Sequence, residues 1–200
     1  MTRKNKTIIN ISLSLALVCA LLLSMNGFAS ACSEMQSNII RIRVIANSDS
    51  ARDQALKLAV RDAVLQSSNE LFSGTESYSD AVLMAEDNLE FFKECAERAV
   101  YAEGFDYPVF VRMGNEFFDT REYDDFTLPA GEYKTLVFTI GEGRGENWWC
   151  VMFPKVCVGA CSGKLTDTVS ESSANYARNG SKYVLKFKLV EVFRKFTKII

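Results

Sequence analysis

The chain has 200 residues, of which 48% are hydrophobic and 24% charged, a composition that suits one globular domain with extensions. Its net charge is −2, and setting aside residues 1–31 removes three cations and no acid to leave −5, so the bulk charge gives no reason to expect nucleic-acid binding. The sequence has no histidine, which excludes Ser-His-Asp and Cys-His triads and the common histidine zinc sites.

Residues 1–31 have the pattern of an export signal. Three cations precede an apolar run from Ile8 to Leu23, and Ala29-Ser-Ala31 supplies a small-residue cleavage pattern. We expect a cleaved signal peptide; an uncleaved membrane anchor is the alternative, because the run approaches the ~17 residues that a span needs. Lipidation at Cys32 is a third interpretation, which Ala29 disfavours because lipoprotein signals usually carry leucine there. All three interpretations place the body of the chain outside the cytoplasm.

A strand followed by a helix is predicted within residues 40–64. Apolar residues alternate with Arg41 and Arg43 at the period of a half-buried strand, which puts both arginines on its polar face. Asn47-Ser-Asp-Ser50 ends the strand, because these side chains favour turns and helix caps. Ser50 with Asp53 three residues later is typical of a helix N-terminus, and apolar residues at helical spacing follow.

A second helix and several strands are predicted next. The helix begins at Ser77 or Ser79 and continues to about Ala102, and Gly104 ends it. Glycine-containing turns separate the predicted strands, which cover residues 107–113, 116–123, 133–140 and 148–153. This order predicts an α+β fold, a mostly antiparallel sheet with two main helices packed on one face.

The cysteines favour a disulfide bond. Outside the export signal five cysteines remain, and paired thiols are the default in an oxidising compartment. We expect Cys150 to pair with Cys157, because both lie close to the strand 148–153 and Pro154 can turn the chain back. Cys157 with Cys161 is the alternative. No C-x-x-C motif is present, so no metal site is expected.

The C-terminal part differs in composition from the rest. Residues 159–181 are rich in serine and glycine and predict a linker or mobile loop. Residues 183–189 alternate between apolar residues and lysines as a strand would, and helical spacing follows. The segment Lys182–Ile200 carries six cations and one acid. This basic amphipathic segment could contact a membrane surface or a partner's helix; the alternative is that it packs back on the domain with its lysines solvated.

Four segments resemble, in the same order, those of the stage II sporulation protein R family. They are Ile45–Val64, Glu103–Pro108, Thr127–Tyr133 and Gly141–Pro154, with Cys157 after the last. The resemblance implies a sporulation-signal domain over residues 39–158, no enzymatic activity and no cofactor. It also implies secretion from the forespore into the space between forespore and mother-cell membranes. There a member activates a membrane-embedded aspartic protease of the mother cell, which processes the sigma-E precursor.

Interface chemistry suggests which residues would contact that partner. Arginine and aromatic side chains are the usual anchors of protein interfaces, and adjacent tryptophans on a strand point to opposite sheet faces. The alternative role of these residues is structural, as caps, strand charges and core aromatics. The candidate partner-binding residues are Arg41, Arg43, Asn47, Asp49, Trp148 and Trp149.

Two other function classes remain open. An exported carboxylate-dependent hydrolase or cell-wall-binding protein is the first, and its carboxylates would be Asp49 with Asp53, or Asp124 with Asp125. Capping and turn formation explain these residues more simply, so no catalytic residue is expected. The glycines of residues 141–147 precede a strand and not a helix, so they favour a hairpin connection over a phosphate-binding loop. A lipid-anchored structural protein held through Cys32 is the second class.

Overall fold

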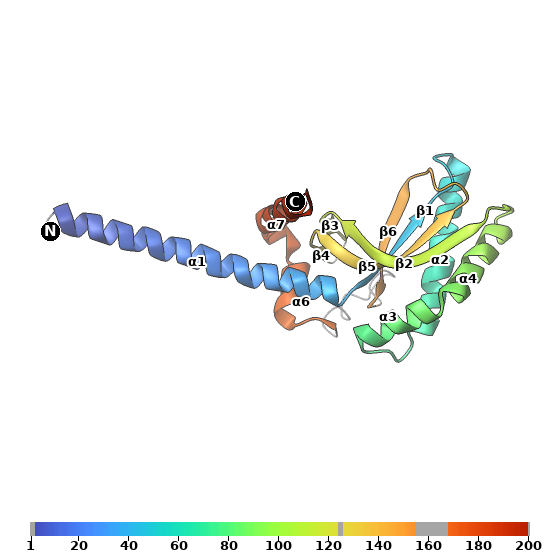
Figure 1. The fold of residues 1–200 in the computed structure, drawn as a ribbon, viewed down its shortest axis with the longest axis horizontal. Helices are drawn as coiled ribbons and strands as arrows, with labels where there is room; N and C mark the ends of the chain where they lie inside the picture. Colours follow the sequence, from blue (N-terminus) through green and yellow to red (C-terminus); the bar gives the residue numbers. More distant parts are fainter. Residues whose placement is uncertain (1–2, 124–125, 155–167, 200) are drawn as a thin grey trace.

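The computed structural model describes residues 3–123, 126–154 and 168–199 (Figure 1). A four-stranded sheet lies between two layers of helices, and a long N-terminal helix projects from one end. The elements are α1 Arg3–Ser37, β1 Ile40–Ile45, α2 Ala51–Leu71, α3 Tyr78–Asp87, α4 Leu89–Ala102, β2 Val109–Phe118, β3 Arg121–Glu122, β4 Thr127–Leu128, β5 Gly131–Ile140, β6 Asn147–Phe153, α6 Glu171–Arg178, a 3-10 turn Gly180–Lys182 and α7 Val184–Ile199.

The sheet has the strand order β2-β5-β1-β6, so the first strand of the domain lies inside the sheet. β1 runs parallel to β5, where Ile40 pairs with Lys134, and antiparallel to β6. β2 pairs antiparallel with β5, and the short strands β3 and β4 form a separate hairpin. The predicted α+β fold with a mostly antiparallel sheet is therefore confirmed, with one parallel pair at its centre.

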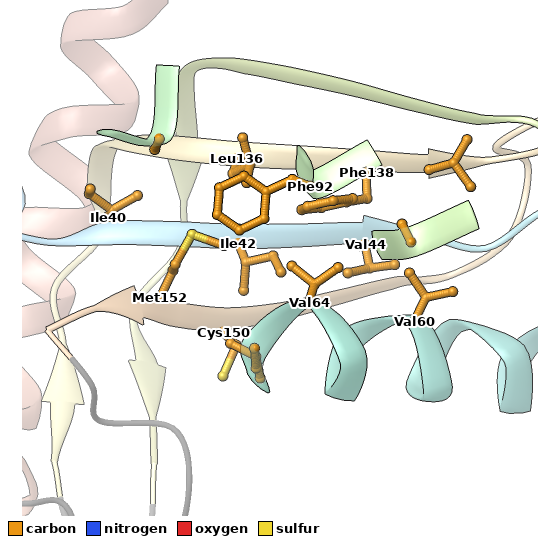
Figure 2. Close-up of a cluster of buried hydrophobic side chains, with 14 of the residues drawn as sticks. Ile40, Ile42, Val44, Val60, Val64, Phe92, Leu136, Phe138, Cys150 and Met152 are labelled. Atoms are coloured by element: carbon orange, nitrogen blue, oxygen red, sulfur yellow. The ribbon is translucent and has the colours of Figure 1, made fainter. Parts of the chain in front are cut away.

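One face of the sheet is covered by α2, α3 and α4. The apolar positions of β1 that alternate with its arginines point into this layer, as the period of two predicts. Their neighbours come from α2, α4, β5 and β6 (Figure 2). The labelled side chains of this core are Ile40, Ile42, Val44, Val60, Val64, Phe92, Leu136, Phe138, Cys150 and Met152.

The opposite face is also covered, which the sequence analysis does not anticipate. The last turns of α1, the β3–β4 hairpin, α6 and α7 enclose a second apolar cluster over this face. Phe28 of α1 lies at its centre with no exposed surface, and its ring meets those of Tyr176 and Phe187 edge-on at 5.1 and 4.9 Å. The expectation that β1 turns a polar face to solvent is wrong for Arg41, which is fully buried there.

Three local predictions differ from the structure. The second helix is interrupted at Asn88 and forms α3 and α4. The predicted turn at Gly114-Asn115 is wrong, because β2 continues through both residues in register with β5. The predicted strand over 183–189 is also wrong: these residues belong mostly to α7, where Phe187 and Val190 reach the second cluster from one helical face.

The N-terminal segment and the predicted linker both contain helices. Among the described residues, Ile9–Ser37 is a helix long and apolar enough to cross a membrane, which is compatible with the predicted signal segment. Within the predicted linker 159–181, residues 171–178 form α6, capped by Ser170. Cys157 and Cys161, and with them the predicted disulfide of Cys150, lie outside the described residues.

Candidate functional site

The six candidate partner-binding residues do not form one continuous surface. The adjacent tryptophans point to opposite faces of β6, as their position on a strand requires. The loop after β1 faces the β5–β6 connection, at one end of the sheet. The three places are the second face for Arg41, Arg43 and Trp149, the loop after β1 for Asn47 and Asp49, and the α2 face for Trp148.

Asp53 is the centre of the network at the start of α2. Its carboxylate accepts hydrogen bonds from the Asn47 amide at 2.9 Å and the Ser48 hydroxyl at 2.5 Å. Its own N–H donates to the Ser50 side chain, which confirms the predicted helix cap. Burial alone would raise the pKa of Asp53, but the hydrogen bonds from Ser48, Asn47, Ser50 and Tyr107 outweigh it and hold this pKa below its usual value. Asp53 is therefore an ionised, fully engaged structural carboxylate.

The same loop holds the glycine-rich connection between β5 and β6. Asn47 accepts a hydrogen bond from the Glu142 N–H through its side chain, and Asp49 accepts one from the Glu146 N–H at 2.7 Å. A Cβ at Gly145 would collide with the Ser48 carbonyl, so the backbones approach more closely than any other residue permits. Asn47 and Asp49 thus join two loops, and this contact explains why glycines occupy the connection.

Arg41 is buried without a carboxylate partner among the described residues. Its guanidinium carbon lies 3.7 Å from the Phe118 ring centre and 5.1 Å from that of Tyr133. Nη2 donates to the Tyr123 hydroxyl at 2.5 Å, whereas Nε and Nη1 have no hydrogen-bond partner in the described part of the chain. Burial lowers the pKa of this guanidinium, and the nearby Tyr123 and Tyr133 only partly oppose the shift. With no exposed surface, Arg41 cannot itself touch a partner in this conformation.

Arg43 takes part in a charged cluster on the same face. Its Nη1 lies 2.8 Å from Glu116 Oε2, its Nε donates to Asn147, and its guanidinium lies over the Trp149 ring at 4.6 Å. Arg112 binds the other oxygen of Glu116 at 2.5 Å. Burial raises the pKa of Glu116, but the two arginines more than compensate and lower it overall. The cluster ties β1, β2 and β6 together at the sheet surface.

Trp148 lies at a cleft between α2 and the edge strand β6. The cleft has a volume of about 520 Å³. Trp148 is 37% exposed, and the guanidinium of Arg61 lies 4.6 Å from its ring centre. The remaining lining residues are Asp62, Leu65, Gln66, Asn69 and Cys150. An exposed aromatic ring beside a cation at a cleft is an arrangement suited to binding a protein segment.

Sequence reasoning missed several partners of the candidate residues. Glu116 and Tyr123 come from segments far along the chain, and only pairing between β2, β5 and β1 brings Glu116 to Arg43. Arg61 was detectable, since it lies on α2 with Asp62 at the solvent side of the apolar stripe. Asp124 and Asp125 lie outside the described residues. Among the described residues, no group of three histidine, cysteine, aspartate or glutamate side chains could hold a metal ion.

Comparison with known proteins gives a consistent result. The profile of the family described as stage II sporulation protein R (spore_II_R) matches residues 36–162. The curated stage II sporulation protein R of Bacillus subtilis (strain 168) is 37% identical over 118 residues, which are 59% of this chain and 53% of that protein. The chain thus spans about half the length of this curated relative. No solved structure matches.

Proposed function

The chain belongs to the stage II sporulation protein R family, and from that premise we propose that it is an exported signal of endospore formation. The signal activates a membrane-embedded aspartic protease of the mother cell, which then processes the sigma-E precursor. The observation that carries the proposal is the extent of the family match: residues 36–162 include all four strands of the central sheet and helices α2 to α4. The match thus covers the folded domain itself.

The N-terminal helix supports the proposed destination. Ile9–Ser37 is long and apolar enough to engage a membrane, as an export signal must. The proposed site of action is the space between the forespore and mother-cell membranes. An oxidising compartment of this kind also suits the proposed bond between Cys150 and Cys157.

We place the contact with the protease at the cleft beside Trp148. Arg41 is enclosed, and Asn47 and Asp49 are engaged in holding loops together. Trp148 and Arg61, by contrast, present an exposed aromatic ring and a cation beside α2. An exposed segment of the partner could insert a side chain into the cleft beside the Trp148 ring. Binding activates the protease only if its active arrangement accepts this contact better than its inactive one does.

The hydrolase alternative has less support from the site. Asp49 and Asp53, its candidate carboxylates, already accept backbone and side-chain hydrogen bonds within the domain. A general acid needs a raised pKa, whereas the pKa of Asp53 is lowered. Incubation of the purified chain with cell-wall material tests this alternative directly, and release of soluble fragments would favour it.

Co-expression in a non-sporulating host tests the proposed function. The host carries the membrane protease and the sigma-E precursor, together with the full chain, a chain lacking residues 2–31, or no chain. Cleavage of the precursor only with the full chain is the expected result. No cleavage, with all three proteins present and folded, refutes the proposal.

Two aromatic variants test the contact within the same assay. Trp148→Ala is expected to reduce cleavage by about thirtyfold, since a central aromatic anchor contributes about 2 kcal/mol or more to binding. The matched control is Tyr101→Ala, which removes an 81% exposed aromatic ring from α4. Equal activity of the two variants would exclude the cleft as the binding surface while leaving the proposed function intact.

A further inference from the structure

Helix α7 presents an apolar stripe to solvent on the side opposite its packed side. Phe187 and Val190 are buried in the second cluster, 2% and 8% exposed. Leu185, Leu189 and Val192 are 75%, 50% and 50% exposed, and their spacing puts them on one face. No residue in the described part of the chain covers them. Exposed leucines and valine in a row are unusual on a helix that faces water alone.

Cations flank this stripe. Lys186 and Lys188 lie in the first turns of α7, and Lys182 lies in the 3-10 turn before it. Residues 182–200 carry a net charge of +5. The one acid of this segment, Glu191, is 8% exposed, and its Oε2 lies 3.3 Å from Lys188 Nζ. An apolar stripe bordered by lysines is the pattern of a helix that lies in the headgroup region of a membrane.

The position of α7 beside α1 provides the second observation. Lys186 Nζ donates to the Ser24 hydroxyl at 2.7 Å, and Ser24 directly follows the apolar run of residues 8–23. At 1.5 Å per residue this run is about 24 Å long, close to the ~30 Å thickness of a bilayer core. Figure 1 looks nearly along the axis of α7 while α1 runs across the picture, so the helices cross. A membrane that α1 enters end-on would therefore have α7 lying along its surface.

The contacts also give the direction in which the stripe faces. On α1, Phe28 contacts Phe187, and Ser24, one turn closer to the apolar run, contacts Lys186. Successive residues of an α-helix are about 100° apart around its axis. Turning around α7 from Phe187 toward Lys186 and then further in the same sense leads to Leu189. Moving along α1 toward its apolar run thus corresponds to moving around α7 toward the exposed stripe. Leu189, the stripe residue nearest to Lys186 around the helix, therefore lies toward the apolar run of α1.

From these observations we propose that α7 is an interfacial helix that seats the domain on an anionic membrane. Its stripe of Leu185, Leu189 and Val192 enters the headgroup region, its lysines meet acidic lipid headgroups, and α1, kept as the uncleaved anchor, passes into the bilayer beside it. The domain is thereby held in a fixed orientation, with the sheet and α2 to α4 directed away from the surface. The inference is independent of the proposed function, since it requires neither the protease nor the sigma-factor precursor.

Depth-dependent quenching of tryptophan fluorescence tests the proposal on the full chain. The chain is reconstituted into vesicles of phosphatidylcholine and phosphatidylglycerol in equal parts, with or without bromine on the acyl chains. Leu189→Trp is the test variant, and Leu83→Trp, at a 57% exposed position on α3, is the matched control. Leu15→Trp reports insertion of α1, and the unmodified chain gives the signal of Trp148 and Trp149.

The expected result is quenching of the added tryptophan at residue 189 that is several-fold greater than at residue 83. Replacing phosphatidylglycerol by phosphatidylcholine is expected to reduce this quenching several-fold, because the lysines lose their anionic partners. Equal quenching at residues 83 and 189, with residue 15 quenched, overturns the proposal. Burial of residue 189 only after the protease is added would assign the stripe to a protein partner and likewise overturn it.

Discussion

Arg41→Met is expected to make the folded chain more stable, although it removes a buried side chain with three close contacts. Methionine keeps the length and the apolar contact area of the arginine stem and adds a favourable sulfur–aromatic contact beside Phe118. The variant removes a cation whose Nε and Nη1 atoms have no hydrogen-bond partner and which no carboxylate neutralises among the described residues. It therefore isolates the cost of keeping this charge inside the domain.

The magnitude follows from three opposing contributions. Burying one ion costs several kcal/mol, taken here as about 5 kcal/mol. The cation–π contact with Phe118 offsets about 2 kcal/mol of this cost, and the hydrogen bond to Tyr123 offsets about 1.5 kcal/mol. The net cost of the charge is then about 1.5 kcal/mol, so removing it should raise the midpoint of thermal unfolding by about 3–6 °C for a chain of this size.

Thermal unfolding of the purified chain in a mild detergent, followed by near-ultraviolet circular dichroism, measures this shift. Arg43→Met is the matched control, because Arg43 is ion-paired with Glu116 and its loss takes one of the two arginine partners from that carboxylate. The control should be destabilised by about 1–3 kcal/mol. A midpoint for Arg41→Met that falls as far as the control's would refute the reasoning and mean that the guanidinium is satisfied in the folded chain. A more stable variant that no longer signals would show that the charge is kept for function.

Three further substitutions test the structure. Phe28→Ala should lower the free energy of unfolding by about 3–4 kcal/mol in a chain that keeps α1, since it empties the centre of the second cluster; an unchanged value would mean that α1 does not pack there. Gly145→Ala should lower the free energy of unfolding by about 1–3 kcal/mol, because the new Cβ would meet the Ser48 carbonyl. Its control is Gly27→Ala, which should be neutral or slightly stabilising because a Cβ there meets nothing. Similar unfolding midpoints for the two variants would contradict the loop contact. The pKa of Asp53 in the folded chain lies below its unfolded value of about 3.9. Its contribution to the free energy of unfolding is therefore complete above about pH 3.9 and is lost as the pH falls through the folded pKa. Acid titration of the free energy of unfolding should therefore be shallower for Asp53→Asn, and a parallel curve would argue against the network.

The domain was predictable from the sequence where a repeating pattern meets one buried face. In β1 and α2 the apolar residues that repeat along the sequence are the ones buried in the first core. The spacing of the apolar residues therefore predicts the buried side of each element. The cap at Ser50 was predictable for the same local reason. The pattern could not reveal that the other side of β1 is covered as well, because the segments that cover Arg41 come from both ends of the chain.

The errors have a common physical origin. Gly114-Asn115 has the composition of a turn, but continuous pairing with β5 keeps both residues in a strand. The lysines that alternate with apolar residues after residue 182 suggest a strand. Contacts with α1 and α6 instead stabilise a helix that buries Phe187 and Val190. Tertiary contacts decided each case. The candidate site was predictable as residue types, but its division over two faces and a loop depends on strand order, which no local pattern contains.

The place of β1 in the sheet bears on how such a chain can be exported. β1 is the first strand to leave the ribosome, yet both of its neighbours come from residues 131–153. Ile40 therefore cannot pair until Lys134 and Phe153 have been synthesised. Contacts this distant in sequence form slowly, and until they form the β1 edges have no partner strand. A chain that cannot complete its sheet early stays unfolded, and an unfolded chain can pass through a translocation channel. In the proposed export, this topology would delay completion of the sheet until residues 131–153 are available to β1.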